Sequence, residues 1–389
     1  MSRTVLAIDI GSATITAAVA GGDNDQPQVL RPAQGECWPA AVHVDADGTL
    51  ILDEARHRQA ASTIPRVTRL LGREATIIGG TVRHADALLA AALTPVLTAA
   101  TTTMRENIDL VVATYPSTWP EPVVGAFRHA ITEFAPAEGL LIPWSDAVAA
   151  ATFAPVPFVD CPITSIDFGA RSASVTMARV DQQGRAKTEY TITNPEGGLR
   201  QIAAPIIAEV AQSLGRTLPG ELEDAPWWDE ACAAFGAARR DPGAAWSTGG
   251  ALPAGSMVVA FPEPLGTLNL AFQEATDMLV EQLLLPQGQV RERVGFAPPP
   301  PQRAHLSLLD QLLRRTPVQG RWTVPGNPHA ARPLVELTGG FGQDPAVVQA
   351  VREYTQSEAV VAELPAQVAA YGAAVLGERR QSRLIGARR

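Results

Sequence analysis

A strand–turn–strand pattern occurs twice in this sequence, about 160 residues apart. In the first copy, residues 4–9 and 14–20 alternate between apolar and small polar positions on either side of a glycine-containing turn. In the second copy, residues 163–167 and 173–180 form the same arrangement. Alternation of this kind is typical of β-hairpins, and duplication at this scale predicts two related lobes with a cleft between them.

Each copy ends its first strand with an aspartate and places a glycine in the turn that follows. The two segments are Asp9-Ile10-Gly11 and Asp167-Phe168-Gly169. Glycine lets the backbone turn tightly enough for N–H groups to point at an anion, and a carboxylate at a strand end holds Mg²⁺ through the waters of the ion. One such turn is equally compatible with an ordinary hairpin, but two predict a clamp that holds a polyphosphate from both sides.

A third glycine-containing element lies near the end of the sequence. Residues Leu334–Leu337 predict a strand that runs into Thr338-Gly339-Gly340, and Asp344 followed by proline predicts the start of a helix. Two adjacent glycines allow the backbone to lie flat against the base and ribose of a nucleotide. The alternative is a plain strand–Gly-Gly–helix connection without a ligand.

Together these three elements resemble the actin, hexokinase and DnaK superfamily, in which each lobe carries one phosphate loop. Five shorter segments are similar to the DnaK-type heat-shock chaperones and follow that family's order along the chain. These segments are Trp38–Val42, Arg69–Arg73, Asp146–Ala151, Asn194–Leu199 and Ala370–Ala374. The resemblance implies an α/β, actin-like ATPase fold with two related lobes around a central cleft, each with a mixed five-stranded sheet and flanking helices. It assigns lobe I to residues 1–160, lobe II to residues 161–376 and a basic tail to residues 377–389.

The resemblance also implies a site for ATP or ADP with Mg²⁺. It gives catalytic roles to Asp9, Asp146 and Asp167, and it has Asp9 and Asp167 hold the Mg²⁺ through water. The nucleotide-binding residues that it implies are Gly11, Ser12, Ala13, Gly169, Ala170, Arg171, Ser172, Gly197, Gly198, Gly339, Gly340 and Phe341.

Three departures from the family pattern bear on function. The family's catalytic lysine follows a Gly-Arg pair, but this sequence has Glu74 at that position and contains a single lysine, Lys187. Ala170 and Arg171 stand where the family's second phosphate loop has glycines. The family's peptide-binding domain would follow Leu376, where about a dozen residues remain, so we expect the peptide-binding half to be missing.

Composition and charge narrow the alternatives. The net charge of −9 argues against a general nucleic-acid-binding protein, because phosphate backbones favour basic surfaces. The three cysteines have no disulfide or zinc-site spacing, which is typical of a reducing cytoplasm. No signal peptide is visible, and the most apolar stretch, Ala85–Ala100, is interpreted as a buried helix too short to span a bilayer. We therefore expect a cytoplasmic protein with no nucleic-acid binding and no membrane insertion.

The sequence leaves four functions open. The first is a chaperone-like, ATP/ADP-binding switch that binds a protein partner of unknown identity and is at most a slow ATPase. The second is an active ATPase that serves as a minimal chaperone or assembly factor, with a secretion system as one setting. The third is a small-molecule kinase, for which no specific sugar-site motif is present, and the fourth is an actin-type filament former. Glu74 and the short segment after residue 376 favour the first.

Overall fold

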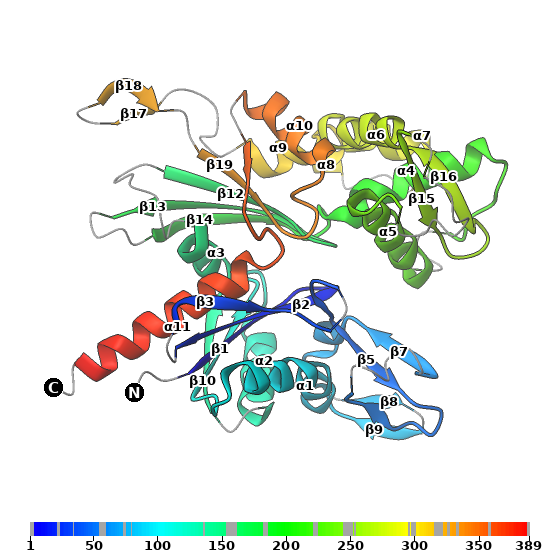
Figure 1. Cartoon of the computed structure of the whole chain (residues 1–389). Coiled ribbons are helices and arrows are strands. Elements are labelled where there is room, and N and C mark those ends of the chain that lie inside the picture. Colours follow the sequence, from blue (N-terminus) through cyan, green and yellow to red (C-terminus); the bar gives the residue numbers. More distant parts are fainter. Residues whose placement is uncertain are drawn as a thin grey trace. The chain divides into compact units, whose positions relative to one another are not determined.

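The chain folds into a mixed α/β structure of two compact units, which a computed structural model describes (Figure 1). The described residues are 4–21, 24–33, 35–53, 60–72, 75–78, 80–134, 137–152, 162–181, 186–220, 225–243, 252, 254–294, 296, 301–314, 322–324, 327–331, 334–356 and 359–386. Unit 1 comprises Met1–Asp160, Ala178–Glu189 and Ala366–Arg389, and unit 2 comprises Cys161–Met177 and Tyr190–Pro365.

Unit 1 is built on a mixed sheet with the strand order β11-β10-β1-β2-β3, in which the short strand β4 also pairs with β2. The pairs β1–β10 and β10–β11 are parallel, and the pairs β1–β2 and β2–β3 are antiparallel. The strands are β1 (Val5–Ile10), β2 (Thr14–Gly21), β3 (Asn24–Leu30), β4 (Trp38–Pro39), β10 (Leu110–Tyr115) and β11 (Glu138–Pro143).

The two faces of this sheet are covered by different helices. Leu6 and Ile8 of β1 point to one face and belong to a core that includes side chains of α1 (Ala85–Met104) and α2 (Glu121–Phe134). The opposite face is covered by α11 (Val368–Gly386), which also packs against α3 (Trp144–Thr152). Alternation of side chains along each strand produces this division.

Two glycines allow α11 to lie close to its neighbours. A Cβ at Gly372 would lie 1.8 Å from the carbonyl oxygen of Ala147 in α3. A Cβ at Gly377 would lie 2.8 Å from side-chain atoms of Val5 and Val112. The sequence assigns residues 161–376 to lobe II and 377–389 to a separate tail, whereas these contacts place all of α11 in unit 1 and the helix continues to Gly386.

Helix α1 extends past the apolar stretch Ala85–Ala100, as the helical periodicity over Asp86–Met104 predicts. It runs through Pro95 to Met104, and threonine hydroxyls near its end bond to carbonyl groups one turn earlier, as Thr101 does to Leu97 at 3.0 Å. Among the described residues it is the one helix long and apolar enough to cross a bilayer by length and composition alone. The stretch Ala85–Ala100 is thus part of a longer helix, and the length argument against a membrane span does not hold for the whole of that helix. Its buried side chains, Leu88, Leu89, Leu93, Val96 and Ala100, belong to the core of unit 1.

Smaller elements complete unit 1. They are a three-stranded sheet of β6 (Leu50–Ile51), β5 (Ala41–Val44) and β7 (Ser62–Pro65), the 3-10 helix η2 (Val67–Leu70), and the hairpin of β8 (Thr76–Ile78) and β9 (Thr81–Arg83). The short helix predicted from Asp53 onward falls on residues 54–59, which lie outside the described residues.

Unit 2 contains a five-stranded sheet with the order β14-β13-β12-β19-β20. The pairs β12–β19 and β19–β20 are parallel. The strands are β12 (Pro162–Phe168), β13 (Ala173–Val180), β14 (Ala186–Asn194), β19 (Leu334–Thr338) and β20 (Ala359–Val361). This order matches β3-β2-β1-β10-β11 of unit 1, so the duplication that the sequence shows in the hairpins extends to both parallel strands beside them.

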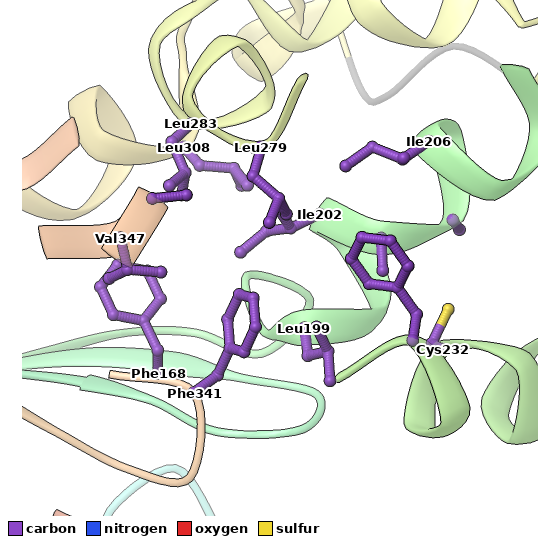
Figure 2. Close-up of a cluster of buried hydrophobic side chains, with 14 of the residues drawn as sticks. Phe168, Leu199, Ile202, Ile206, Cys232, Leu279, Leu283, Leu308, Phe341 and Val347 are labelled. Atoms are coloured by element: carbon purple, nitrogen blue, oxygen red, sulfur yellow. The ribbon is translucent and has the colours of Figure 1, made fainter. Parts of the chain in front are cut away.

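The helices of unit 2 surround a second core, part of which Figure 2 shows. Phe168 at the end of β12 and Phe341 lie there beside Leu199, Leu279 and Leu308 of three different helices. The helices are α4 (Leu199–Ser213), α5 (Ala225–Arg240), α6 (Phe272–Leu284), α7 (Gln287–Arg293), α8 (Pro301–Ala304), α9 (Leu308–Leu313) and α10 (Pro345–Thr355). Two hairpins, β15 (Ser256–Ala260) with β16 (Thr267–Ala271) and β17 (Trp322–Val324) with β18 (Asn327–Ala331), complete the unit.

Helix α5 (Ala225–Arg240) lies within residues 216–256, a segment whose sequence shows no regular helical or strand pattern. The aromatic pair Trp227 and Trp228 begins this helix and is buried, with ring centroids 5.0 Å apart. Core packing of these rings stabilises a segment whose alanine-rich sequence carries a weak periodic signal. Both tryptophans pack in the core of unit 2 and do not form an exposed patch.

Candidate functional site

In unit 1, Asp9 lies at the carboxyl end of β1, beside a threonine from each neighbouring strand. It pairs in register with Thr114 of β10 and with Thr16 of β2. The Thr114 hydroxyl donates a hydrogen bond to Oδ1 of Asp9. Burial raises the pKa of the Asp9 carboxyl to about 6, against an ordinary value of 3.8, and the hydrogen bond from Thr114 partly opposes this rise.

The turn after β1 is closed by its own backbone. The Gly11 amide donates to the Thr14 carbonyl at 2.9 Å, and a Cβ at Gly11 would lie 3.2 Å from that oxygen. The Ala13 carbonyl accepts a bond from the Ala40 amide at 2.8 Å, and Ser12 lies half-buried between them. The turn is compact, but the Gly11 amide, which the sequence assigns to phosphate, is engaged within the turn itself.

Asp146 lies at the same edge of the unit 1 sheet as Asp9. Strand β11 pairs Ile142 with Thr114, the residue that pairs with Asp9, and then leads directly into α3. Asp146 occupies the first turn of α3 and is exposed. The carboxyl ends of parallel strands are the usual place for ligand-binding residues in α/β sheets, so the structure brings Asp9, the 11–13 turn and Asp146 to one edge.

In unit 2, Asp167 repeats the arrangement of Asp9. It lies near the carboxyl end of β12 and pairs in register with Thr338 of the parallel strand β19. The Thr338 hydroxyl, which is buried, donates to Oδ2 of Asp167 at 3.3 Å. Each unit therefore has a strand-end aspartate hydrogen-bonded to a threonine on the adjacent parallel strand.

The loop after β12 packs its carbonyl groups against the start of α4. The Gly169 amide closes the turn by donating to Ser172 at 2.9 Å, as Gly11 does to Thr14. Amides at the start of α4 then donate to three consecutive loop carbonyls. These bonds are Leu199 to Gly169 at 3.0 Å, Arg200 to Ala170 at 3.1 Å, and Gly198 to Arg171 at 2.9 Å.

These three bonds fix the direction of the loop amides. In a planar trans peptide the C=O and N–H groups point in opposite directions. Because the carbonyls of Gly169, Ala170 and Arg171 point toward α4, the amides of the next residues, Ala170 to Ser172, point away from it. Successive N–H groups on one side of a turn form a concave anion-binding surface. The side chains of Ala170 and Arg171 do not prevent this geometry.

Gly197 and Gly198 lie just before α4, where the backbone is tightly packed. A Cβ at Gly198 would lie 2.4 Å from the carbonyl carbon of Arg171 and 2.6 Å from the carbonyl oxygen of Gly169. A Cβ at Gly197 would lie 3.0 Å from the side chain of Asn194. The Gly198 amide donates to the loop, so it is not available to a nucleotide in this structure. Because a Cβ would collide with the loop backbone, the close packing of loop and helix requires glycine at position 198.

Arg171 extends from the loop to α5. Its Nη2 donates to both carboxylate oxygens of Asp229, at 2.7 and 2.9 Å. Arg200, in the first turn of α4, donates from Nη1 to Oδ1 of the same aspartate at 2.6 Å. The sequence predicts a phosphate contact for Arg171, whereas in this structure its guanidinium is paired with Asp229.

The Gly339–Gly340 loop packs directly on the strand end that carries Asp167. Gly339 has φ +84°, and a Cβ there would lie 2.5 Å from the Phe168 carbonyl oxygen and 2.6 Å from Asp167 Oδ2. The Phe341 amide donates to the same Phe168 oxygen at 3.0 Å. A Cβ at Gly340, in contrast, meets no atom within 4 Å. Gly339 therefore holds the loop against the sheet, and Gly340 faces open space.

Phe341 has a different role from the one expected. The sequence places it against the adenosine, but its ring is 2% exposed and lies in the core beside Phe168 and Val347 (Figure 2). Its side chain anchors the loop. Only the backbone at this position is left to contact a ligand.

Two arginines at the end of α5 bind the segment that contains the Gly339–Gly340 loop and Asp344. The sequence did not indicate this role for them. Arg239, which is 4% exposed, forms a two-nitrogen ion pair with Asp344 at 2.8 and 2.9 Å, and its guanidinium lies 4.0 Å from the centre of the Phe272 ring. Asp344 also caps α10 by accepting from the Ala346 amide at 2.9 Å. Arg240 donates to the Gly340 carbonyl at 3.3 Å. The available signal was the Arg-Arg pair that ends α5.

The expected residues thus gather at one sheet edge in each unit. Asp9, the 11–13 turn and Asp146 gather in unit 1, and Asp167, the 169–172 loop and the 339–341 loop gather in unit 2. Glu74, at the position of the family's lysine, lies outside the described residues.

The residues present suit Mg²⁺ held through water better than a metal held by protein ligands alone. Among the residues that the structure describes, no group of three or more His, Cys, Asp or Glu side chains is placed to hold a metal ion. Mg²⁺ commonly keeps several waters and takes one or two carboxylates, which is what a single strand-end aspartate in each unit supplies. No protein-family model and no curated protein matches the sequence.

Proposed function

We propose that this protein binds ATP and ADP with Mg²⁺ through an actin-like ATPase fold related to the nucleotide-binding domain of DnaK-type chaperones. The observation that carries the proposal is the loop after β12. Its three carbonyls point to α4 and its next three amides point away, beside a strand-end carboxylate. This combination suits a phosphate group and the hydrated Mg²⁺ that accompanies it.

The duplicated topology supports the fold assignment. Both sheets have the same strand order, with two successive parallel pairs on one side of the first strand. Both first strands end in an aspartate that accepts a bond from threonine, and both following turns are closed by a glycine amide at 2.9 Å. An actin-like ATPase needs this repeated unit, because each lobe supplies one phosphate loop.

The proposal gives each element a role. The amides of Ser12 and Ala13 and those of residues 170–172 bind phosphate oxygens, whereas the Gly11 amide closes its own turn. Asp9 and Asp167 hold waters of Mg²⁺. The Gly339–Gly340 loop offers open backbone at Gly340 for the adenosine. When bound, Mg²⁺ neutralises phosphate charge. That the two phosphate loops contact the same nucleotide stays a prediction.

Binding is proposed to exceed hydrolysis, so that the bound nucleotide sets the state of a switch that engages a protein partner. The reason is Glu74, which stands where a lysine would stabilise charge on the terminal phosphate. Loss of one preorganised interaction of this kind costs about 10²–10³ in rate. The phosphate contacts proposed here come from backbone amides, which that change leaves in place.

A second candidate is an active ATPase that acts as a minimal chaperone or assembly factor. The retained strand-end carboxylates favour it, since Asp9 and Asp167 are each held in place by a threonine hydroxyl. An oriented carboxylate near phosphate positions the attacking water in phosphoryl-transfer sites.

Calorimetric titration with Mg-ATP and Mg-ADP tests the binding proposal. The wild type is compared with Gly340→Trp and Gly340→Ala. A Cβ at this position meets no atom within 4 Å, so both variants should fold. We expect Trp to abolish binding and Ala to retain most of it. Equal affinity in all three proteins would show that the adenosine assignment is wrong, and absence of binding in the wild type would refute the proposal.

A further inference from the structure

Two arginines from different elements share one carboxylate beside the proposed phosphate loop. Arg171 lies in the loop, Arg200 in the first turn of α4 and Asp229 in α5. Their side chains are 27%, 13% and 19% exposed, respectively. The Asp229 carboxylate is therefore an anion of the protein itself that already occupies the arginine of the proposed phosphate loop.

The geometry of the two ion pairs differs. Both bonds from Arg171 come from one nitrogen, Nη2, rather than from the two-nitrogen fork that makes the strongest arginine–carboxylate pairs. The bond from Arg200 is shorter, at 2.6 Å, and its side chain is the more buried of the two arginines. Arg171 is therefore the partner that is easier to exchange.

Arg200 lowers the cost of that exchange. Removing the partner of a buried carboxylate is strongly destabilising, because an uncompensated charge remains. If Arg171 moves, Asp229 keeps its bond to Arg200, so no such charge is left behind. The three loop amides that point away from α4 lie in the same four-residue turn as Arg171, so an anion bound there is within reach of its side chain.

We infer that Asp229 competes with ligand phosphate for Arg171. In the absence of ligand, Asp229 holds Arg171 against α5, and Arg200 holds Asp229. Binding of a polyphosphate to the loop transfers Arg171 from the carboxylate to a phosphate oxygen, while Arg200 remains on Asp229. The intramolecular carboxylate thereby lowers the affinity for ligands whose phosphate takes Arg171, and it leaves unchanged the affinity for ligands that do not contact this arginine. This inference rests on the proposed phosphate role of the loop.

The test uses calorimetry on four proteins: wild type, Asp229→Asn, Arg171→Gln and the double variant. Each is titrated with Mg-ATP, inorganic tripolyphosphate and adenosine. Asp229→Asn should tighten Mg-ATP and tripolyphosphate by about tenfold, the worth of one hydrogen bond to a charged group. Adenosine affinity should not change, and the gain should vanish in the double variant. Glu230→Gln, an exposed neighbour on α5, removes the same charge and should leave all three affinities unchanged.

The outcomes separate the inference from the proposed function. If the wild type binds Mg-ATP but Asp229→Asn gives no gain, or the gain persists without Arg171, the competition is refuted and nucleotide binding stands. If no protein binds adenosine or Mg-ATP but Asp229→Asn gains tripolyphosphate affinity through Arg171, the competition stands and nucleotide binding is refuted. If none binds any ligand, both are refuted.

A measurement on the wild type covers the case in which Asp229→Asn does not fold. The Nε–H signal of Arg171 in an NMR spectrum is assigned by its loss in Arg171→Gln. Its shift on addition of tripolyphosphate is the expected result. An unchanged signal at saturating ligand would show that Arg171 stays on Asp229 and would overturn the inference.

Discussion

Thr338 donates a hydrogen bond to Asp167 from the neighbouring parallel strand, just as Thr114 does to Asp9 in the other unit. The two partners lie 171 residues apart in the first pair and 105 residues apart in the second. Pairing of parallel strands, and not local sequence, therefore brings each threonine to its aspartate. The two pairs orient the carboxylates that are proposed to hold waters of Mg²⁺.

Thr338→Val should weaken Mg-dependent ADP binding by about tenfold, because Asp167 loses one donor that orients its carboxylate. Thr338→Ser should retain most of the affinity. Thr355→Val is a matched control, since Thr355 is also buried in unit 2 and its hydroxyl donates to the Val351 carbonyl within α10. Calorimetry with and without Mg²⁺ makes the comparison, and equal losses for Thr338→Val and Thr355→Val would argue for a general packing effect instead.

The raised pKa of Asp9 predicts a pH-dependent stability. Its folded-state pKa is about 6 and its ordinary value is 3.8, so the folded protein binds the proton more tightly than the unfolded chain. Stability from this group is fully present below pH 3.8 and is lost as the pH rises through 6, by about 3 kcal/mol. Asp9→Asn should therefore raise the free energy of unfolding at pH 8 and change it much less at pH 4.

Denaturant unfolding without Mg²⁺ at the two pH values measures this effect. Asp146→Asn serves as the control, because Asp146 is an exposed aspartate of the same unit. An Asp9→Asn variant that is no more stable than the wild type at pH 8 would contradict the assignment of a buried, costly carboxylate.

Gly198→Ala should destabilise the protein by about 1–3 kcal/mol, the usual cost of forcing extra volume into a packed region. The added methyl group would lie 2.4 Å from the Arg171 carbonyl carbon, and backbone atoms cannot rotate away. Gly340→Ala, which adds the same group where no atom lies within 4 Å, should be close to neutral. Thermal and denaturant unfolding of the pair decides the point, and similar stabilities would mean that the loop is not packed on α4 in this way.

Arg239→Met should cost about 3–5 kcal/mol, because it leaves the Asp344 carboxylate buried without its ion-pair partner. The double variant Arg239→Met/Asp344→Asn should recover much of this loss, since asparagine is neutral and still caps α10. Unfolding free energies of the two variants test this, and a double variant no better than the single one would show that packing of Arg239 on Phe272 matters more than the charge.

Hydrolysis should be absent or much slower than in an ordinary DnaK-type domain, and Glu74→Lys should raise it by about 10²-fold or more. Glu74→Gln separates removal of a negative charge from gain of a positive one. Steady-state phosphate release is the measurement, with Asp167→Asn as the inactive reference. A wild-type rate equal to that of a DnaK-type domain, abolished by Asp167→Asn, would favour the active-ATPase function instead.

Local pattern was enough to predict the hairpins and their turns. The Asp-x-Gly turns at Asp9 and Asp167 form as predicted, because strand alternation and the freedom of glycine act over a few residues. The strand that ends at Thr338 and the helix that begins at Pro345 are confirmed for the same reason. The mixed α/β class follows from these elements.

Long-range packing decided what these elements contact, and the sequence alone did not show it. Helix α11 belongs with unit 1 because Gly372 and Gly377 let it approach α3 and the sheet. The Phe341 ring is in the core and Arg171 is paired with Asp229, 58 residues away in the chain. Side-chain type indicates what a residue can bind, but its actual partner depends on which segments the folded chain brings within a few ångströms, and periodicity within one segment carries no information about that.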